Sequence, residues 1–328
     1  MNLKKLPYET LHCHTRHSDG QLDYKEVLDE CKKNKIGVVA FTDHDAVPHP
    51  RRLKQLEKLK HEVSFFPGIE LSANFVREVK GKISLFHIVG LFIDPENKEL
   101  RNFCHWAKQK RLERAVKIVN NLSKLGFDIS ISTVEQYAKG EIIGRPHIVK
   151  AILAKTQNLE ILDQILKKMP AAAKKEILTH DRRQQVFDLV LDDHSFVKGI
   201  YVHYLYPISM DEGVRLIRGA GGIALLAHWS YYKDKVGLPL VEKFCREKRI
   251  DGLETVYGFE VDLKRAKEFA KDREDLSKLA QKYHLVEGGG GDFHNQEDFK
   301  QMLDPGSQAL AEKTVGMVEK ILQIRYNR

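Results

Sequence analysis

The chain alternates short apolar runs, rich in β-branched and aromatic residues, with segments whose apolar residues recur every three or four positions. The first pattern predicts buried strands and the second predicts amphipathic helices. Alternation of this kind builds βα units, whose parallel strands are covered on both faces. We therefore expect an α/β barrel with a largely parallel sheet. The seven predicted strands lie within residues 8–14, 37–44, 63–71, 83–92, 222–229, 252–257 and 285–293.

The strand pattern disappears between about residues 98 and 198, where the sequence turns helical. The helical period is clearest over residues 103–127, and a further helix is expected to begin near Pro146, since proline is favoured in the first turn. We therefore expect the first part of the barrel at 1–97, a mainly helical insertion that caps the substrate site at 98–198, and the second part of the barrel at 199–328.

Length and composition favour a globular protein. With 328 residues, 42% of them hydrophobic, the chain can bury a large core. No run approaches the roughly 18 apolar residues of a membrane span, and the first residues lack the apolar stretch of a signal peptide. The four cysteines form no CxxC pair, so neither a disulfide framework nor a cysteine zinc site is indicated. We expect a soluble, cytoplasmic protein without a membrane partner.

Positive charge is concentrated in one region. The formal net charge is +8, and residues 101–150 contain ten Lys or Arg against four Asp or Glu. Such an excess suits a polyanionic ligand, and it suits a solvated helix face equally well. Charge alone leaves both interpretations open.

Side chains that commonly bind metals stand at or near the ends of the predicted strands. In a parallel barrel the carboxyl ends of the strands form one rim, where active sites lie. His12 and His14 are two residues apart, so both imidazoles of an extended strand point to the same face, and Asp292 and His294 repeat this spacing. An isolated histidine pair is usually structural, but the recurrence favours a shared site. The nine candidate metal-binding and catalytic residues are His12, His14, Asp19, His44, Glu70, His87, His228, Asp292 and His294.

The donor types narrow the choice of metal. Imidazole nitrogens mixed with carboxylate oxygens suit zinc, manganese or iron, whereas calcium and magnesium sites are dominated by oxygen. Nine ligands are too many for one ion, so we expect two or three divalent ions, with Glu70 able to bridge two of them. Such clusters activate a hydroxide for attack on phosphorus. Asp43 and Asp45, on either side of His44, are expected to support ligands or to be solvated.

Six separated motifs, HCHTRHSDG, FTDHD, PGIELS, HIVGLF, LLAHW and GGDFH, resemble in order the motifs of the PHP family, named for polymerase and histidinol phosphatase domains. The resemblance implies a distorted TIM-like barrel of seven βα units and a metal-dependent phosphoesterase in which metal-bound hydroxide attacks. It also implies a distribution of ligands over three ions: His12, His14, Glu70 and Asp292 for one, Glu70, His87 and His228 for the second, and Asp19, His44 and His294 for the third.

The helical region carries GRPHIVKAIL, which is similar to the stand-alone nucleotide phosphoesterase branch of that family. This resemblance implies hydrolysis of a nucleoside monophosphate, a nucleoside 3',5'-bisphosphate or the 5' end of short RNA or DNA; it implies no protein partner. Arg145 and His147 match phosphate-binding positions; the residues alone fit a solvated arginine and a packed histidine on a capped helix equally well. His17, Ser18 and His203 are further candidates for substrate contact.

Three other functions are considered. A histidinol-phosphate phosphatase, or another small-molecule phosphatase, would share the metal site but would not need the helical insertion. A proofreading exonuclease would use the basic insertion to guide a strand, although regularly interleaved aromatic residues are lacking. A non-catalytic PHP module would have lost metal ligands, and none of the nine is missing.

Three features depart from the family pattern. Trp229 stands where relatives typically have proline, and its ring is expected to alter the pocket wall. Residues 288–291, directly before Asp292, are all glycine, where relatives usually have serine or threonine before the aspartate. Glycines permit close contact between backbone segments. The stretch 169–194 matches no motif, so it leaves substrate choice open.

Overall fold

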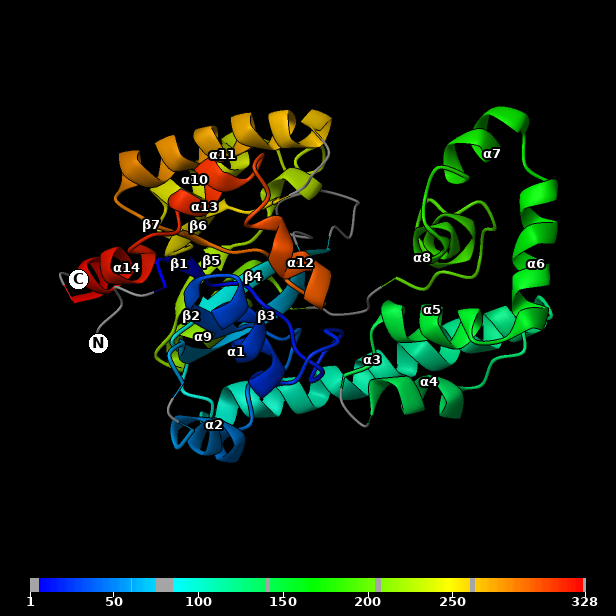
Figure 1. Cartoon of the computed structure of the whole chain (residues 1–328), viewed down its shortest axis with the longest axis horizontal. Helices are drawn as coiled ribbons and strands as arrows, with labels where there is room; N and C mark the ends of the chain where they lie inside the picture. Colours follow the sequence, from blue (N-terminus) through cyan, green and yellow to red (C-terminus); the bar gives the residue numbers. More distant parts are fainter. Residues whose placement is uncertain are drawn as a thin grey trace. The chain divides into compact units, whose positions relative to one another are not determined.

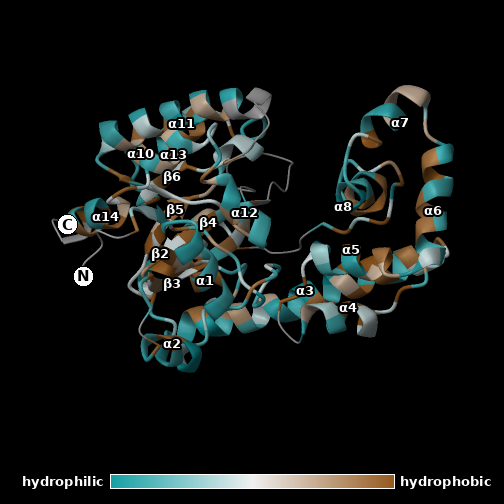
Figure 2. Cartoon of the chain, in the orientation of Figure 1, coloured by the Kyte–Doolittle hydropathy of each residue, from teal (hydrophilic) through white to brown (hydrophobic). Residues whose placement is uncertain are grey.

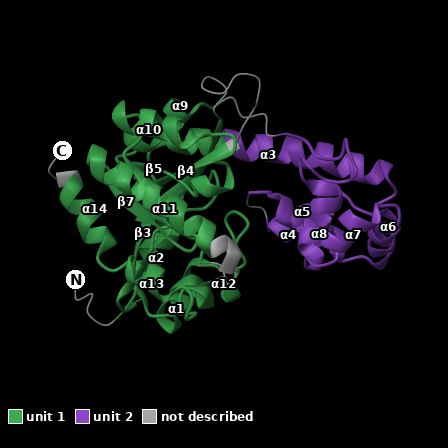
Figure 3. Ribbon diagram, turned by 90° about the horizontal axis from the view of Figure 1, so that it is seen from above, with its two compact units in different colours: residues 1–105, 206–328 green, residues 106–205 purple. Residues whose placement is uncertain are grey.

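The computed structural model describes residues 6–59, 61–74, 85–139, 142–203, 208–259 and 263–326. The chain divides into two compact units, Met1–His105 with Tyr206–Arg328 and Trp106–Leu205, coloured green and purple in Figure 3. The expected boundaries at 98 and 198 fall a few residues before these divisions. The role of the second unit as a substrate cap stays a prediction.

Seven strands form one sheet in the first unit, in the order β1 to β7 (Figure 1). Each predicted run contains or overlaps one of these strands. The first two residues of the predicted run 83–92 lie outside the described residues. The α/β class with a seven-stranded, mostly parallel sheet is confirmed. The strands are β1 (Tyr8–Thr10), β2 (Ile36–Phe41), β3 (Ser64–Asn74), β4 (Leu85–Leu91), β5 (Ile223–Leu226), β6 (Gly252–Val256) and β7 (Val286–Gly289).

Strand β4 differs from the expected parallel repeat. It runs antiparallel to β3 and to β5, whereas the other neighbouring pairs are parallel. Asn74 at the end of β3 pairs with Leu85 at the start of β4, and residues 75–84 between them are fewer than the dozen or so that a parallel crossover needs. The amino end of β4 therefore lies at the same rim as the carboxyl ends of the other strands.

The first and last strands form no ladder with each other, but the segments at their carboxyl ends are joined. The Leu11 N–H donates to the Gly289 carbonyl at 3.0 Å, and the Asp292 N–H donates to the His12 carbonyl at 3.0 Å. A Cβ on Gly290 would lie 2.5 Å from the Thr10 Oγ1 and 2.6 Å from the His12 nitrogen. The glycine run is thus what allows this close approach of the two segments.

Helices cover the sheet of the first unit. Helix α1 begins with a reciprocal capping box between Asp23 and Glu26, and it buries Val27, Leu28 and Cys31. Figure 2 shows hydrophobic residues on β2 and hydrophilic ones along α2. These helices are α1 (Tyr24–Lys33), α2 (Pro50–Glu57), α9 (Met210–Gly219), η3 (Trp229–Tyr231), α10 (Leu238–Arg246), α11 (Leu263–Tyr283), α12 (Gln296–Gln301), α13 (Gln308–Glu312) and α14 (Met317–Tyr326).

The second unit has its own hydrophobic core, in which Leu122, Ile148, Leu162 and Val186 are almost inaccessible to solvent. Its described residues contain no strand. The helices are α3 (Lys98–Lys124), within which the first division falls, and α4 (Ile131–Ala138), α5 (Arg145–Leu153), α6 (Thr156–Lys167), α7 (Ala171–Ile177), α8 (Arg182–Val186) and the π-helical turn η2 (Phe187–Leu191). In the described part of the chain, no helix has the length and apolar character needed to cross a membrane.

Candidate metal centre

The nine predicted side chains come together at one rim of the sheet. They form four overlapping groups, and within each group the nitrogen and oxygen atoms lie within 4.8 Å of one another. The groups are His14, Asp19, His44 and His294; His12, His14 and Asp292; His12, Glu70 and His228; and His44, Glu70 and His87. We call these nine residues the rim cluster.

The topology explains why residues so far apart in the sequence meet. His12 and His14 follow β1, His44 follows β2 and His228 follows β5, each past the carboxyl end of a parallel strand. His87 is the third residue of β4, and it reaches the same rim because β4 runs in the opposite direction. Two residues of the rim cluster, His228 and Asp292, have positive φ angles of 29° and 50°, an unusual conformation for residues other than glycine.

Glu70 lies at the junction of the groups and is almost completely buried. Its Oε1 is 2.8 Å from the His87 Nδ1 and 2.9 Å from the His228 Nε2. Its Oε2 is 2.7 Å from the His44 Nδ1 and 3.2 Å from the His14 Nε2. Burial opposes ionisation of this carboxyl, but the positive character of the surrounding imidazoles holds its pKa well below its ordinary value. Each oxygen can therefore serve a different ion.

Two aspartates, Asp292 and Asp19, contribute further carboxylate oxygens to the rim cluster. The Asp292 Oδ1 lies 2.9 Å from the His14 Nε2 and 3.4 Å from the His12 Nε2. Asp19 lies 3.4 Å from the His294 Nε2 and 3.9 Å from the His44 Nε2. His44 thus stands between the Glu70 and Asp19 groups, whereas the family pattern placed it only with Asp19 and His294.

His12 and His14, which follow β1, are held by hydrogen bonds at their Nδ1 atoms. The His12 Nδ1–H donates to the Glu254 Oε1 at 2.8 Å. The Ser18 hydroxyl donates to the Asp43 Oδ1 at 2.7 Å, and it accepts from the His14 Nδ1–H at 3.3 Å. Both rings therefore direct Nε2 toward the interior of the cluster, an arrangement typical of metal-binding histidines.

Glu254 is a residue that the sequence analysis missed. It lies on β6, is 1% exposed, and accepts a second hydrogen bond at Oε2 from the His228 backbone N–H at 2.7 Å. The available signal was a carboxylate in the middle of a buried strand, which is unusual unless the carboxylate is paired.

The aspartates beside His44 support the loops and are not solvated. Asp43 is fully buried and accepts hydrogen bonds from the Thr15 N–H, the Thr15 hydroxyl and the Ser18 hydroxyl, each at 2.7 Å. Asp45 is also buried, and its Oδ1 accepts from the Ser72 N–H at 2.8 Å.

The residues of the rim cluster fit divalent cations. Buried atoms without a hydrogen-bond partner include the Asp19 Oδ1, the Glu70 Oε2 and the Asp292 Oδ1. Two pairs of ring nitrogens face each other at 3.2 Å, His12 with His14 and His87 with His228. Buried polar atoms are normally paired, so converging lone pairs of this kind call for positive charge between them.

The pKa values of two histidines lead to the same conclusion. Burial opposes protonation of His14, but the Asp292 and Glu70 carboxylates beside its ring raise its pKa to about 10. Burial lowers the pKa of His87 to about 4, against the attraction of Glu70. The carboxylates thus attract positive charge into a site where His87 stays neutral, which is the form in which imidazole binds a metal.

The remaining candidates of the first unit lie beside the cluster. Ser18 is buried and joins His14 to Asp43. His17 is 8% exposed, stacks on Tyr24 and lies with its Nε2 3.2 Å from the Arg52 Nη1. Ser18 therefore orients the His14 ring, and substrate contact by His17 stays a prediction.

Arg145, His147 and His203 belong to the second unit, where each has local partners. The Arg145 Nη1 donates to the Asp192 Oδ2 at 3.1 Å. His147 is buried, and its Nδ1 accepts from the Gly144 N–H at 3.0 Å, which caps helix α5. The His203 Nε2 lies 3.1 Å from the Asp193 Oδ1. These contacts describe a capped helix with local ion pairs, and the predicted phosphate-binding roles are not tested by them.

A cavity of about 290 Å³ opens onto the rim cluster. Its floor includes His44, Glu70 and Asp292, and its wall includes aromatic residues and a lysine. Its lining residues are His44, Glu70, Phe86, His87, His228, Tyr231, Tyr232, Lys235 and Asp292.

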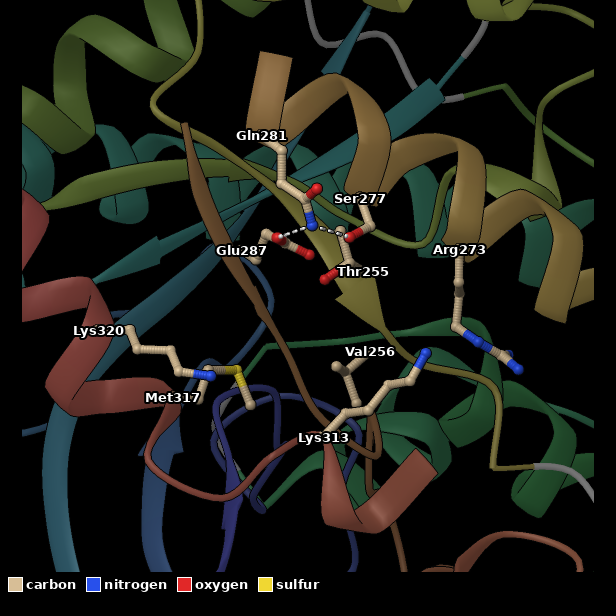
Figure 4. A pocket seen from close by; sticks show the side chains of 9 residues that line it. All are labelled: Thr255, Val256, Arg273, Ser277, Gln281, Glu287, Lys313, Met317 and Lys320. Atoms are coloured by element: carbon tan, nitrogen blue, oxygen red, sulfur yellow. Dashed lines mark hydrogen bonds between the residues drawn. The ribbon is translucent and has the colours of Figure 1, made fainter. Parts of the chain in front are cut away.

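A cavity of similar size, about 270 Å³, lies beside α11 and is drawn in Figure 4. Its described lining includes Arg273, Lys313 and Lys320 but no member of the rim cluster, and the Glu287 carboxylate accepts from the Gln281 amide at 3.4 Å. Chemistry, and not size, therefore identifies the first cavity as the candidate substrate site.

Comparisons with known proteins agree with this geometry. Over 87% of its length, the chain is 23% identical to the 5'-3' exoribonuclease Rnm of Escherichia coli (strain K12), covering 84% of that protein. It is 26% identical to a 3',5'-nucleoside bisphosphate phosphatase of Chromobacterium violaceum, covering 87% of this chain and 86% of the relative.

A solved structure described as an amidohydrolase from Chromobacterium violaceum superimposes with a TM-score of 0.67 at 24% identity, over 88% of each chain. At this identity the likeness shows the fold alone. The PHP domain model matches residues 10–195, which is more than half of the chain. The chain therefore belongs to the PHP domain family.

Proposed function

We propose that this chain is a metal-dependent phosphoesterase whose rim cluster binds two or three divalent ions. The observation that carries the proposal is the position of Glu70, whose two oxygens face different sets of imidazoles within one buried cluster. A carboxylate in this position can bridge two cations, and multinuclear sites of this kind are typical of phosphate ester hydrolysis.

Some residues of the chain would hold the ions, and others orient the residues that hold them. Bound divalent cations would supply Lewis acidity toward phosphoryl oxygens and would lower the pKa of a bound water. His12, His14 and Glu70 would hold these ions. Glu254 keeps His12 in the required tautomer, and Ser18, held by Asp43, does the same for His14.

The proposed substrate is a nucleotide or the 5' end of a short oligonucleotide. Two relatives support this choice by their names, one an exoribonuclease and the other a nucleoside bisphosphate phosphatase. The cavity above the cluster combines aromatic rings with a lysine, which suits a phosphate attached to a planar group. The second unit, with Arg145 and His147, is proposed to cap this substrate.

The test is a hydrolysis assay with added Mn²⁺, which measures release of phosphate from nucleoside monophosphates, nucleoside 3',5'-bisphosphates and histidinol phosphate, and release of mononucleotides from 5'-phosphorylated short RNAs. The wild type should release product from one of the nucleotide or RNA substrates, whereas Glu70→Gln should lose nearly all turnover and bind fewer ions. The matched control is Glu287→Gln, which removes a carboxylate from the cavity beside α11. Release from histidinol phosphate alone would favour the small-molecule phosphatase, and no release from any phosphate ester would refute the proposal.

A further inference from the structure

One segment, residues 229–236, contributes three of the residues that line the cavity, and it follows β5 directly after His228. Trp229 was expected to stand in the pocket wall, but it is 4% exposed and does not line the cavity. Its Nε1–H donates to the Val236 carbonyl at 2.6 Å, so it joins the two ends of the segment. Tyr231, Tyr232 and Lys235 form the wall instead.

Further hydrogen bonds fix the segment to the barrel. The Tyr232 hydroxyl donates to the Ala227 carbonyl at 2.6 Å. The Ser230 hydroxyl donates to the Asp272 Oδ2 at 2.5 Å, and the Lys233 ammonium donates to the same oxygen at 2.8 Å. Asp272 belongs to α11 and is 7% exposed. The segment is thus anchored at both ends and in the middle, which preorganises the side chains that it presents.

Tyr231 is the most exposed aromatic side chain of this wall, with 52% of its surface accessible. Its ring makes perpendicular contacts with His228, at 5.7 Å between centroids, and with Phe269, at 5.3 Å. These contacts hold the ring beside a member of the rim cluster while half of its surface stays open. An apolar ring kept exposed in a rigid segment is a ready stacking surface.

Lys235 lies on the same wall and is exposed. Within the described part of the chain its ammonium has no carboxylate partner, although the cluster carboxylates Glu70 and Asp292 line the same cavity. An ammonium on a flexible stem at the mouth of an acidic site is suited to a phosphate oxygen.

We propose that Tyr231 and Lys235 determine specificity for the organic group and the phosphate of the substrate. Tyr231 stacks on a nucleobase, and Lys235 binds a phosphate oxygen of the same molecule. This inference rests on the proposed function, and it assigns the nucleobase to the first unit of the chain, beside the rim cluster.

The test separates the two roles with ligands that differ by one group. Equilibrium dialysis measures binding of adenosine, which has a base and no phosphate, and kinetics compare AMP with ribose 5-phosphate, which has no base. Tyr231→Ala should weaken adenosine binding and raise the KM for AMP relative to that for ribose 5-phosphate by about 5- to 100-fold. Tyr231→Phe keeps the ring and should retain most of this discrimination.

Lys235→Ala should show the opposite pattern, with a higher KM for AMP and for ribose 5-phosphate and unchanged binding of adenosine. Lys243→Ala, an exposed lysine on α10, is its matched control. Unchanged adenosine binding and an unchanged AMP preference in Tyr231→Ala would overturn the inference while leaving the phosphoesterase proposal intact. Adenosine binding that depends on Tyr231, without phosphate release from any ester, would overturn the proposed function instead.

Discussion

Replacement of Glu254 by glutamine tests whether this carboxylate orients His12 for binding a metal ion. The Glu254 carboxylate accepts two hydrogen bonds, from the His12 Nδ1–H and from the His228 backbone N–H. A glutamine amide offers one oxygen and one NH2 group. If the oxygen keeps the His228 contact, the NH2 group meets His12 and favours the tautomer that carries its proton on Nε2. That tautomer removes the lone pair that His12 directs into the cluster.

The expected magnitude follows from the one hydrogen bond that the substitution removes. A hydrogen bond to a buried charged group is worth about 1.5–3 kcal/mol. Loss of a group that orients a metal-binding histidine typically costs about 10- to 100-fold in metal affinity, which corresponds to about 1.4–2.8 kcal/mol. The two figures agree, so Glu254→Gln should weaken binding of the ion nearest His12 by one to two orders of magnitude.

The assay is a Mn²⁺ titration of chelator-stripped protein, read out by bound metal per chain. Glu287→Gln is the control, because Glu287 lies on the adjacent strand β7 and lines the neighbouring cavity (Figure 4). Circular dichroism checks that both variants fold. Metal affinity equal to that of the wild type in a folded Glu254→Gln variant would refute this account of His12.

Four further outcomes are expected. Gly290→Ala should lower Tm and metal content, because its Cβ would meet the backbone of His12, whereas Gly306→Ala, with open space around its Cβ, should change neither. Leu122→Ala, fully buried in the second unit, should cost about 2–5 kcal/mol in urea unfolding, while alanine at the exposed Leu125 should cost almost nothing. Saturating Mn²⁺ should stabilise the first unit by about 2.7 kcal/mol at a hundred times Kd, a shift lost in Glu70→Gln. Trp229→Phe should weaken adenosine binding without reducing metal content, and equal loss of both would contradict the anchoring role.

The sequence predicted the strands and the cluster because both depend on local signals. Buried strands read as apolar runs, and the spacing of His12 and His14 indicates a shared face. The reversed direction of β4 was missed, since an apolar run is the same read in either direction. His87 was still placed correctly at the rim, because the reversal carries the start of β4 to the edge where the other strands end.

Partners set by tertiary contacts could not be predicted in the same way. Glu254 orients His12 across 242 residues of sequence, and no local pattern marks that pair. Trp229 was expected to alter the pocket wall because it stands where relatives have proline, whereas its ring is buried and its Nε1–H donates to the Val236 carbonyl. The glycine run was noted as unusual, and its reason appeared only with the backbone of residues 10–12 beside it.

The central claim is that Glu70 joins at least two cations within one buried cluster. The most direct test is an anomalous difference map, recorded at the manganese edge, from crystals grown with Mn²⁺. The account predicts two or three peaks at the rim, two of them within bonding distance of the Glu70 carboxylate. A single peak away from Glu70, or none in crystals of protein that hydrolyses phosphate esters, would contradict it.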